Sequence, residues 1–260
     1  MTAALIYREC VEAIRRGDLI EREGINDKEF HFQNWFEKRL VQLGLNYDQP
    51  GRNSYPDFRL VDSPHGYELK GLAYPGRDAN YDSNSQVPVG VHHGRTVYYV
   101  FGRYPKNPDG NKYPVTDLVV CHGDFLNADS DYVHKNKSFK GFGSYGDIMV
   151  RDRKMYVVPT PFALAEGTAH RTTLIIPSSE NPGAGFVEVG KLVRREVDQV
   201  VIAYEFDLRT NAMVTKTAPN PHAGREHTFV AYRLGNEPLD AVTMRSTREV
   251  LAQMKEEIED

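Results

Sequence analysis

The sequence feature that most constrains the fold is a pair of short alternating segments separated by a turn. Phe58 and Leu60 in the first segment, and Tyr67 and Leu69 in the second, alternate with polar positions. This alternation is typical of β-strands with one buried face. The intervening residues 63–66 (SPHG) have turn-forming composition. We therefore expect the two segments to form a β-hairpin.

The hairpin would gather three charged side chains on one face. Glu68 and Lys70 project away from the face of Tyr67 and Leu69, and Asp57 enters the partner strand within reach of them. Two neighbouring carboxylates repel each other unless a cation compensates them. Mg²⁺ binds one or two carboxylates together with water and phosphate oxygens, and a lysine can position or deprotonate a water. The pattern predicts a phosphodiester-hydrolysis site; the alternative is a surface hairpin with a solvated Glu–Lys pair.

These residues resemble the signature of a known nuclease superfamily. Pro56-Asp57, ten further residues and Glu68-Leu69-Lys70 look like the PD-(D/E)XK motif of the restriction-endonuclease-like nucleases. The resemblance, which covers about residues 26–122, implies Asp57, Glu68 and Lys70 as catalytic residues. It also implies that Asp57, Glu68 and the Leu69 carbonyl bind Mg²⁺, for which Mn²⁺ can substitute. The expected products carry 5′-phosphate and 3′-hydroxyl ends.

Two helices are expected before the motif, over residues 3–16 and from about residue 26 to Gly44. In the superfamily, a helix preceding the motif often adds an acidic or amide side chain to the site. Glu37 and Gln33 lie one turn apart beside the apolar stripe of the second helix and are candidates for this support. An exposed Glu37 paired with a neighbouring basic residue is the alternative.

Two polar segments are candidate DNA contacts. A loop over residues 72–86 should rim the site, because it leaves the catalytic strand directly, or it is an ordinary surface loop. Residues 134–154 contain six basic and two acidic residues, a local charge of +4, and suit a loop along a DNA backbone or a plain glycine-rich loop. The GxGxxG match inside this segment lacks the flanking strand and helix that a phosphate-binding loop needs. The candidate DNA-binding residues are Arg77, Asn80, Asn84, Gln86, Lys135, Lys137, Lys140, Arg151 and Arg153.

The expected fold class is α/β (α+β). It has a restriction-endonuclease-like core, a central mixed β-sheet flanked by helices, and a β-rich C-terminal half. The chain reads as a single nuclease domain, 1–260, with a β-rich extension over about 154–245 and a C-terminal helix over about 246–259. Strands are predicted at 96–101, 116–121, 154–159 and 172–177, followed by a β-meander of 199–206, 213–217 and 227–232.

Composition sets further limits. The chain has 40% hydrophobic and 26% charged residues, and without a long apolar run we expect neither a secretory signal nor a membrane span and a cytoplasmic location. Cys10 and Cys121 are expected to be buried and unpaired.

The acidic segment 124–131 lacks the glycine and glutamate of an EF-hand, so we expect a solvated loop or a helix start there. The histidines of loop 219–227 are either metal ligands or free.

The sequence predicts a Mg²⁺-dependent type II restriction endonuclease that acts on double-stranded DNA as a homodimer. One alternative is a structure-specific or repair nuclease similar to a Holliday-junction resolvase. The other is a non-catalytic DNA-binding module with a coincidental motif. The C-terminal half, which offers room for base-reading loops, favours restriction.

Overall fold

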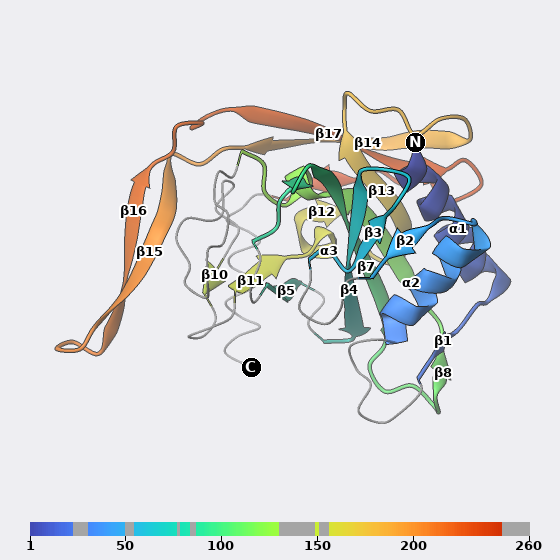
Figure 1. The fold of residues 1–260 in the computed structure, drawn as a ribbon. Coiled ribbons are helices and arrows are strands. Elements are labelled where there is room, and N and C mark those ends of the chain that lie inside the picture. Colours follow the sequence, from blue (N-terminus) through green and yellow to red (C-terminus); the bar gives the residue numbers. More distant parts are fainter. Residues whose placement is uncertain are drawn as a thin grey trace.

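The computed structural model describes residues 1–22, 31–49, 55–76, 79–83, 87–129, 149–150 and 156–245. A large mixed β-sheet runs through the centre of this part of the chain, and two helices lie against it (Figure 1). The predicted α/β class with a central mixed sheet is therefore confirmed, and the helices are few.

The central sheet has nine strands. Its order is β14-β17-β13-β9-β7-β4-β3-β2, with β6 paired to β7. The pairs β4–β7 and β9–β13 are parallel, and the other pairs are antiparallel. The strands are β2 (Tyr47–Asp48), β3 (Phe58–Leu60), β4 (His65–Tyr74), β6 (Val91–His92), β7 (Arg95–Pro105), β9 (Asp117–His122), β13 (Thr172–Pro177), β14 (Phe186–Arg195) and β17 (Glu226–Leu234).

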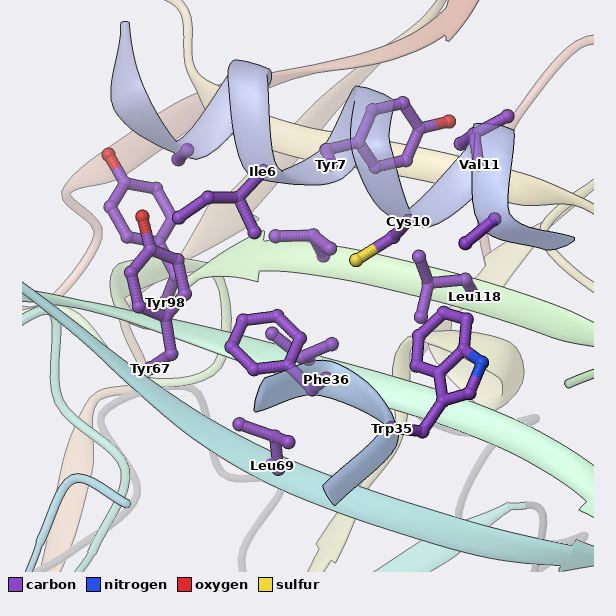
Figure 2. Close-up of a cluster of buried hydrophobic side chains, with 14 of the residues drawn as sticks. Ile6, Tyr7, Cys10, Val11, Trp35, Phe36, Tyr67, Leu69, Tyr98 and Leu118 are labelled. Atoms are coloured by element: carbon purple, nitrogen blue, oxygen red, sulfur yellow. The ribbon is translucent and has the colours of Figure 1, made fainter. Parts of the chain in front are cut away.

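One face of the sheet is covered by helices α1 (Thr2–Arg16) and α2 (His31–Gln42). Gly17 ends α1 in the left-handed region at φ 77°, where glycine carries no side-chain penalty. Figure 2 shows the helix-side core, in which Cys10 of α1 and Phe36 of α2 meet Tyr67 and Leu69 of β4. The predicted helix pair and the burial of alternate hairpin residues are confirmed.

Helix α2 lies close to the sheet because two strand positions have no side chain. A Cβ atom at Gly102 in β7 would overlap the ring of Phe32, and one at Gly71 in β4 would press on the same residue. Phe32 can therefore lie flat against the strands, where it stacks on Trp35 with 5.8 Å between ring centroids. This contact sets the face of α2 that points at the sheet.

The opposite face carries a second core, the loop-side core. Tyr99, Phe101, Val119, Cys121, Ile175 and Ala231 from the strands pack there against Phe125, Phe162 and Val242. The cover consists of the 3₁₀ turn η1 (Gly123–Phe125), the short helix α3 (Pro161–Leu164) and a three-stranded sheet, β10 (Met149–Val150), β11 (Tyr156–Pro159) and β5 (Asn80–Ser83). Among the described residues, the two longer helices thus lie on one face of the sheet, and the short helix α3 lies on the other.

The three strands expected in the C-terminal half form, but their expected arrangement as a meander is wrong. Strand β14 was not predicted, and the third strand of the expected meander, β17, pairs with β14 and β13 in the central sheet. The other two, β15 (Gln199–Asp207) and β16 (Ala212–Pro219), pair with each other and project from the body as a two-stranded arm (Figure 1). The reason is burial, because Phe229 and Ala231 fill the loop-side core while β16 is almost entirely exposed.

Smaller features complete the described fold. Two short pairs join β1 (Ile20–Glu21) to β8 (Lys112–Tyr113) and β12 (Ala165–Glu166) to β18 (Thr243–Met244). Cys10 and Cys121 are buried and free, as expected. No helix in the described ranges is long and apolar enough to cross a membrane. The acidic segment begins with η1, so a helix start is confirmed, but Phe125 and Leu126 are buried rather than solvated.

Candidate active site

The β3–β4 hairpin brings the three motif residues together. Phe58 pairs with Tyr67, so the same register continued by one residue places Asp57 opposite Glu68. Tyr67 and Leu69 lie in the helix-side core. Because side chains alternate along a strand, Glu68 and Lys70 point to the other face of the sheet. The predicted hairpin and the predicted face of the charged residues both agree with this geometry.

The Asp57 side chain accepts a backbone hydrogen bond of β4 at a position beyond the end of strand β3. The Pro56 ring lies over Gly66, where a Cβ atom would overlap it, and the chain leaves the ladder at this point. The Leu69 backbone N–H donates instead to Asp57 Oδ2 at 2.8 Å. Since N–H and C=O of one strand residue face the same edge, the Leu69 carbonyl faces the edge that carries the Asp57 carboxylate.

Glu68 has one carboxylate oxygen without a hydrogen-bond partner in the described part of the chain. Lys70 Nζ donates to Glu68 Oε1 at 2.6 Å, and the side chains are only 12% (Glu68) and 23% (Lys70) exposed. Glu68 Oε2 is buried and has no hydrogen-bond partner among the described residues. A buried carboxylate oxygen without a partner is costly. An oxygen-binding cation fits this donor set.

Three tyrosines surround the charged group. Tyr55 and Tyr99 share a hydrogen bond of 2.8 Å between their hydroxyls, and Lys70 Nζ lies 5.6 Å from the centroid of the Tyr81 ring. Burial raises the pKa of all three phenols, and the negative charge of Glu68 raises them further. The phenols therefore stay protonated and neutral beside the carboxylates.

The sequence patterns alone did not assign these tyrosines to the site. Tyr99 aligns with Glu68 across the parallel β4–β7 pair, and this pairing was not predicted. The alternation of side chains along a strand places Tyr99 on the face opposite to Tyr98. This alternation was the one sequence signal that could have indicated Tyr99 as a neighbour of the charged group. Tyr81 was assigned to a loop, whereas it belongs to β5.

The two candidate support residues are not placed at this group. Helix α2 packs on the helix-side face, where Phe36 contacts Phe58 and Tyr67, so the sheet lies between α2 and Glu68. The Tyr47 hydroxyl donates to Glu37 Oε1 at 2.6 Å, and Gln33 lies half-buried on the same helix. The expected support from Glu37 and Gln33 is corrected, because helical spacing does not tell which face of a sheet the helix covers.

The rim and basic segments fall mostly outside the described residues. The loop expected over 72–86 is in part strand, because β4 continues to Tyr74 and β5 begins at Asn80. Asn80 is 7% exposed and pairs with Pro159, so it does not project from a rim as expected. The other candidate DNA contacts lie outside the described part of the chain: Arg77, Asn84, Gln86, Lys135, Lys137, Lys140, Arg151 and Arg153, together with the helix expected at 246–259.

A second polar cluster joins the segment after η1 to the end of β14 and the start of β17. His227 Nε2 is 3.0 Å from Asp129 Oδ2 and 3.1 Å from Glu196 Oε1. Arg225 donates to Asp129 Oδ2 at 2.8 Å, and Asn220 Nδ2 donates to Glu196 Oε2 at 3.2 Å. Burial raises the pKa of Glu196, although its bonds to Asn220 and His227 oppose the shift.

Carboxylate oxygens of this cluster already have protein partners. Its carboxylate and imidazole atoms lie within 4.8 Å of one another, close enough to surround one ion. The Asn220 amide, the Arg225 guanidinium and the His227 ring already occupy both Glu196 oxygens and Asp129 Oδ2. The Arg225 guanidinium supplies a positive charge beside the Asp129 carboxylate. We interpret the cluster as an ion-pair network that ties these chain segments together.

The chain matches no protein-family model, no curated protein sequence and no solved structure. The residues of the hairpin and their surroundings are therefore the basis on which we infer a function.

Proposed function

We propose that this protein is a metal-dependent endonuclease with a restriction-endonuclease-like core, which hydrolyses phosphodiester bonds in double-stranded DNA. The observation that carries the proposal is the buried Glu68 Oε2 without a hydrogen-bond partner in the described structure. It lies in a group that also holds Asp57 and the paired Lys70. A structural ion pair alone would leave this oxygen unsatisfied, whereas a bound divalent cation would satisfy it.

Each residue of the group has a separate role in the proposed reaction. Asp57, Glu68 and the Leu69 carbonyl would hold Mg²⁺, or Mn²⁺ in its place. A bound divalent ion supplies positive charge for the scissile phosphate and acidifies a water. Lys70 orients the attacking water and offsets the negative charge that develops on the phosphate. The buried phenols of Tyr55 and Tyr99 restrict water beside Glu68 without adding charge.

Within the class of metal-dependent endonucleases, we propose more specifically that the protein is a type II restriction endonuclease. A two-fold symmetric DNA site suits a symmetric pair of protomers, each of which cuts one strand. Digestion of plasmid DNA with Mg²⁺, and again with EDTA, tests this assignment. Discrete bands that disappear with EDTA support restriction, preference for branched substrates indicates a junction resolvase, and binding without any cutting indicates a DNA-binding module.

Substitutions in the motif test the site itself. Asp57→Asn and Glu68→Gln should each reduce Mg²⁺-dependent cleavage at least about 100-fold, because each removes a charge that holds the ion. Lys70→Ala should keep metal binding but lose cleavage to a similar extent, and Lys70→Arg should rescue it poorly, since the guanidinium has another shape and stays protonated. Initial cleavage rates and calorimetric titration with Mn²⁺ measure the two effects separately.

A matched control uses an exposed ion pair elsewhere. Lys112 Nζ lies 2.9 Å from Glu21 Oε1, and both side chains are at least half exposed. Lys112→Ala removes the same kind of contact and should leave cleavage and Mn²⁺ affinity unchanged. Wild-type cleavage rates in Asp57→Asn and Lys70→Ala, or Mn²⁺ bound at other residues in a soaked crystal, would refute the proposed site.

A further inference from the structure

The two-stranded arm formed by residues 199–219 is an unusual element for a folded body. Within the described ranges, strands β15 and β16 pair only with each other, and the arm extends away from the central sheet (Figure 1). It is inserted between β14 and β17, which are antiparallel neighbours. A short turn would suffice to connect such neighbours, so the arm is not needed to complete the sheet.

The root of the arm is bonded to the body. The Asn220 backbone N–H donates to the Asp198 carbonyl at 2.9 Å, and the Gly224 N–H donates to the Glu196 carbonyl at 3.1 Å. Glu196 also accepts from the Asn220 side chain and contacts His227. These bonds fix where the two strands leave the body, so the arm starts from a defined position.

The arm exposes apolar side chains that its own fold does not cover. Ile202 is 39% exposed, Met213 is 51% exposed and Val214 is 45% exposed, and Leu208 at the turn is 86% exposed. An isolated two-stranded hairpin is only marginally stable in water. An arm with this surface therefore gains stability when another strand or surface covers it.

The two edges of the arm differ. Strand β15 has a register shift between Val201 and Ala203 and carries the acidic residues Glu205 and Asp207. Bulges and charges are features that prevent unwanted edge-to-edge pairing. Strand β16 pairs without a bulge of its own, has no acidic residue, and carries a single charge at Lys216. The β16 edge is therefore the one that can accept another strand.

Charge and symmetry select the partner. Residues 199–219 contain two acidic and two basic residues, and Lys216 pairs with Glu205 across the strands at 2.5 Å. A ribbon without excess positive charge is a poor ligand for DNA phosphates. An antiparallel strand edge is complementary to itself about a two-fold axis, so a second copy of the chain offers a matching edge.

We propose that two copies of this chain associate through antiparallel pairing of their β16 edges, which joins the two arms into one four-stranded sheet. The main-chain groups of residues 212–218 supply the hydrogen bonds, and the exposed Met213 and Val214 are covered at the same time. The inference rests on the arm alone and holds whether or not the hairpin site cleaves DNA.

Oligomeric mass of the full chain, without DNA, tests the proposal. Sedimentation equilibrium should show a dimer for the wild type at micromolar concentration. The double substitution Val214→Lys/Thr215→Lys places like charges near the axis and should raise the dimer dissociation constant at least about tenfold. Thr210→Lys/Asn211→Lys adds the same charge at the exposed turn of the same arm and should leave the constant unchanged.

Cysteine cross-linking gives a second, positive test. Cys10 and Cys121 are buried, so single cysteines placed at residues 213–216 can be oxidised selectively. Rapid formation of disulfide-linked dimers in β16, but not with Asn211→Cys at the turn, is the expected result. A wild-type monomer at all concentrations overturns the proposal, and so does a dimer that neither lysine pair weakens and that cross-links equally at the turn.

Discussion

At Gly66, the absence of a side chain allows the Pro56 ring to lie against strand β4. This contact turns the chain out of the ladder, and Asp57 then accepts the Leu69 N–H. The position of the Asp57 carboxylate therefore depends on a residue that takes no part in the proposed chemistry. Such a dependence is common where a site is formed at the end of a strand.

Gly66→Ala should displace Pro56 and with it Asp57. We expect Mn²⁺ affinity to fall at least about tenfold, and the free energy of unfolding to fall by about 1–3 kcal/mol because the added methyl group overpacks the site. Calorimetric titration and urea unfolding measure the two effects. Gly235→Ala is the control, since the nearest atom to its added Cβ is 3.5 Å away. Equal metal affinity in both variants would contradict this account of the Asp57 position.

At the scale of single elements, η1 depends on a neutral histidine. The Asp124 backbone N–H donates to His122 Nδ1 at 3.1 Å, which requires that this nitrogen carry no proton. Burial lowers the pKa of His122 to about 4, although the charge of Glu180 opposes the shift. The nearby Asp124 carboxylate, 3.6 Å from Nδ1, would favour protonation, but the backbone bond and the burial both favour the neutral ring.

The resulting pH dependence follows from linkage. His122 in the unfolded chain takes up a proton near pH 6.5, whereas the folded chain resists it until about pH 4, so stability falls as the pH decreases through this window. The expected contribution is about 2 kcal/mol between about pH 7 and pH 5. His122→Asn keeps an acceptor for the Asp124 backbone N–H but removes the titrating group. Its loss of stability over this pH range should therefore be smaller than that of the wild type by about 2 kcal/mol. Urea unfolding at both pH values measures the loss of stability in the wild type and in His122→Asn. Identical losses in the two proteins would exclude this role of His122.

At the scale of the whole molecule, the arm and the body are expected to be separable. The body has a core on each face of the central sheet, and among the described strands those of the arm pair only with each other. Asp198 and Asn220 already lie within hydrogen-bonding distance at the root. Within the arm, Val201 packs against the edge of the loop-side core, so removing the arm takes away this contact and leaves the buried residues of both cores in place.

Replacing residues 199–219 by Asn-Gly should leave a folded, monomeric body. We expect its free energy of unfolding to stay within about 1 kcal/mol of that of the intact chain, because few buried contacts are lost. Chemical unfolding measured on dilute, monomeric samples checks this value, and the retained motif residues should still bind Mn²⁺. Loss of cooperative unfolding would show that the arm contributes to the body.

Some features of this protein follow from the sequence by itself. The hairpin around Asp57, Glu68 and Lys70, helix α1 and strand β13 were predictable, because alternation, helical spacing and turn residues act over a few neighbouring positions. The face on which Glu68 and Lys70 lie follows from the same alternation. These local rules were enough to bring the motif residues together.

Other features were decided only by tertiary structure. The sequence of β17 is equally compatible with pairing to β16 or to β14, and burial of Phe229 and Ala231 in the loop-side core selects β14. The face covered by α2, which separates Glu37 from Glu68, depends on the close approach of Phe32 to the sheet. Such choices depend on packing between segments far apart in the chain, which local sequence patterns do not encode.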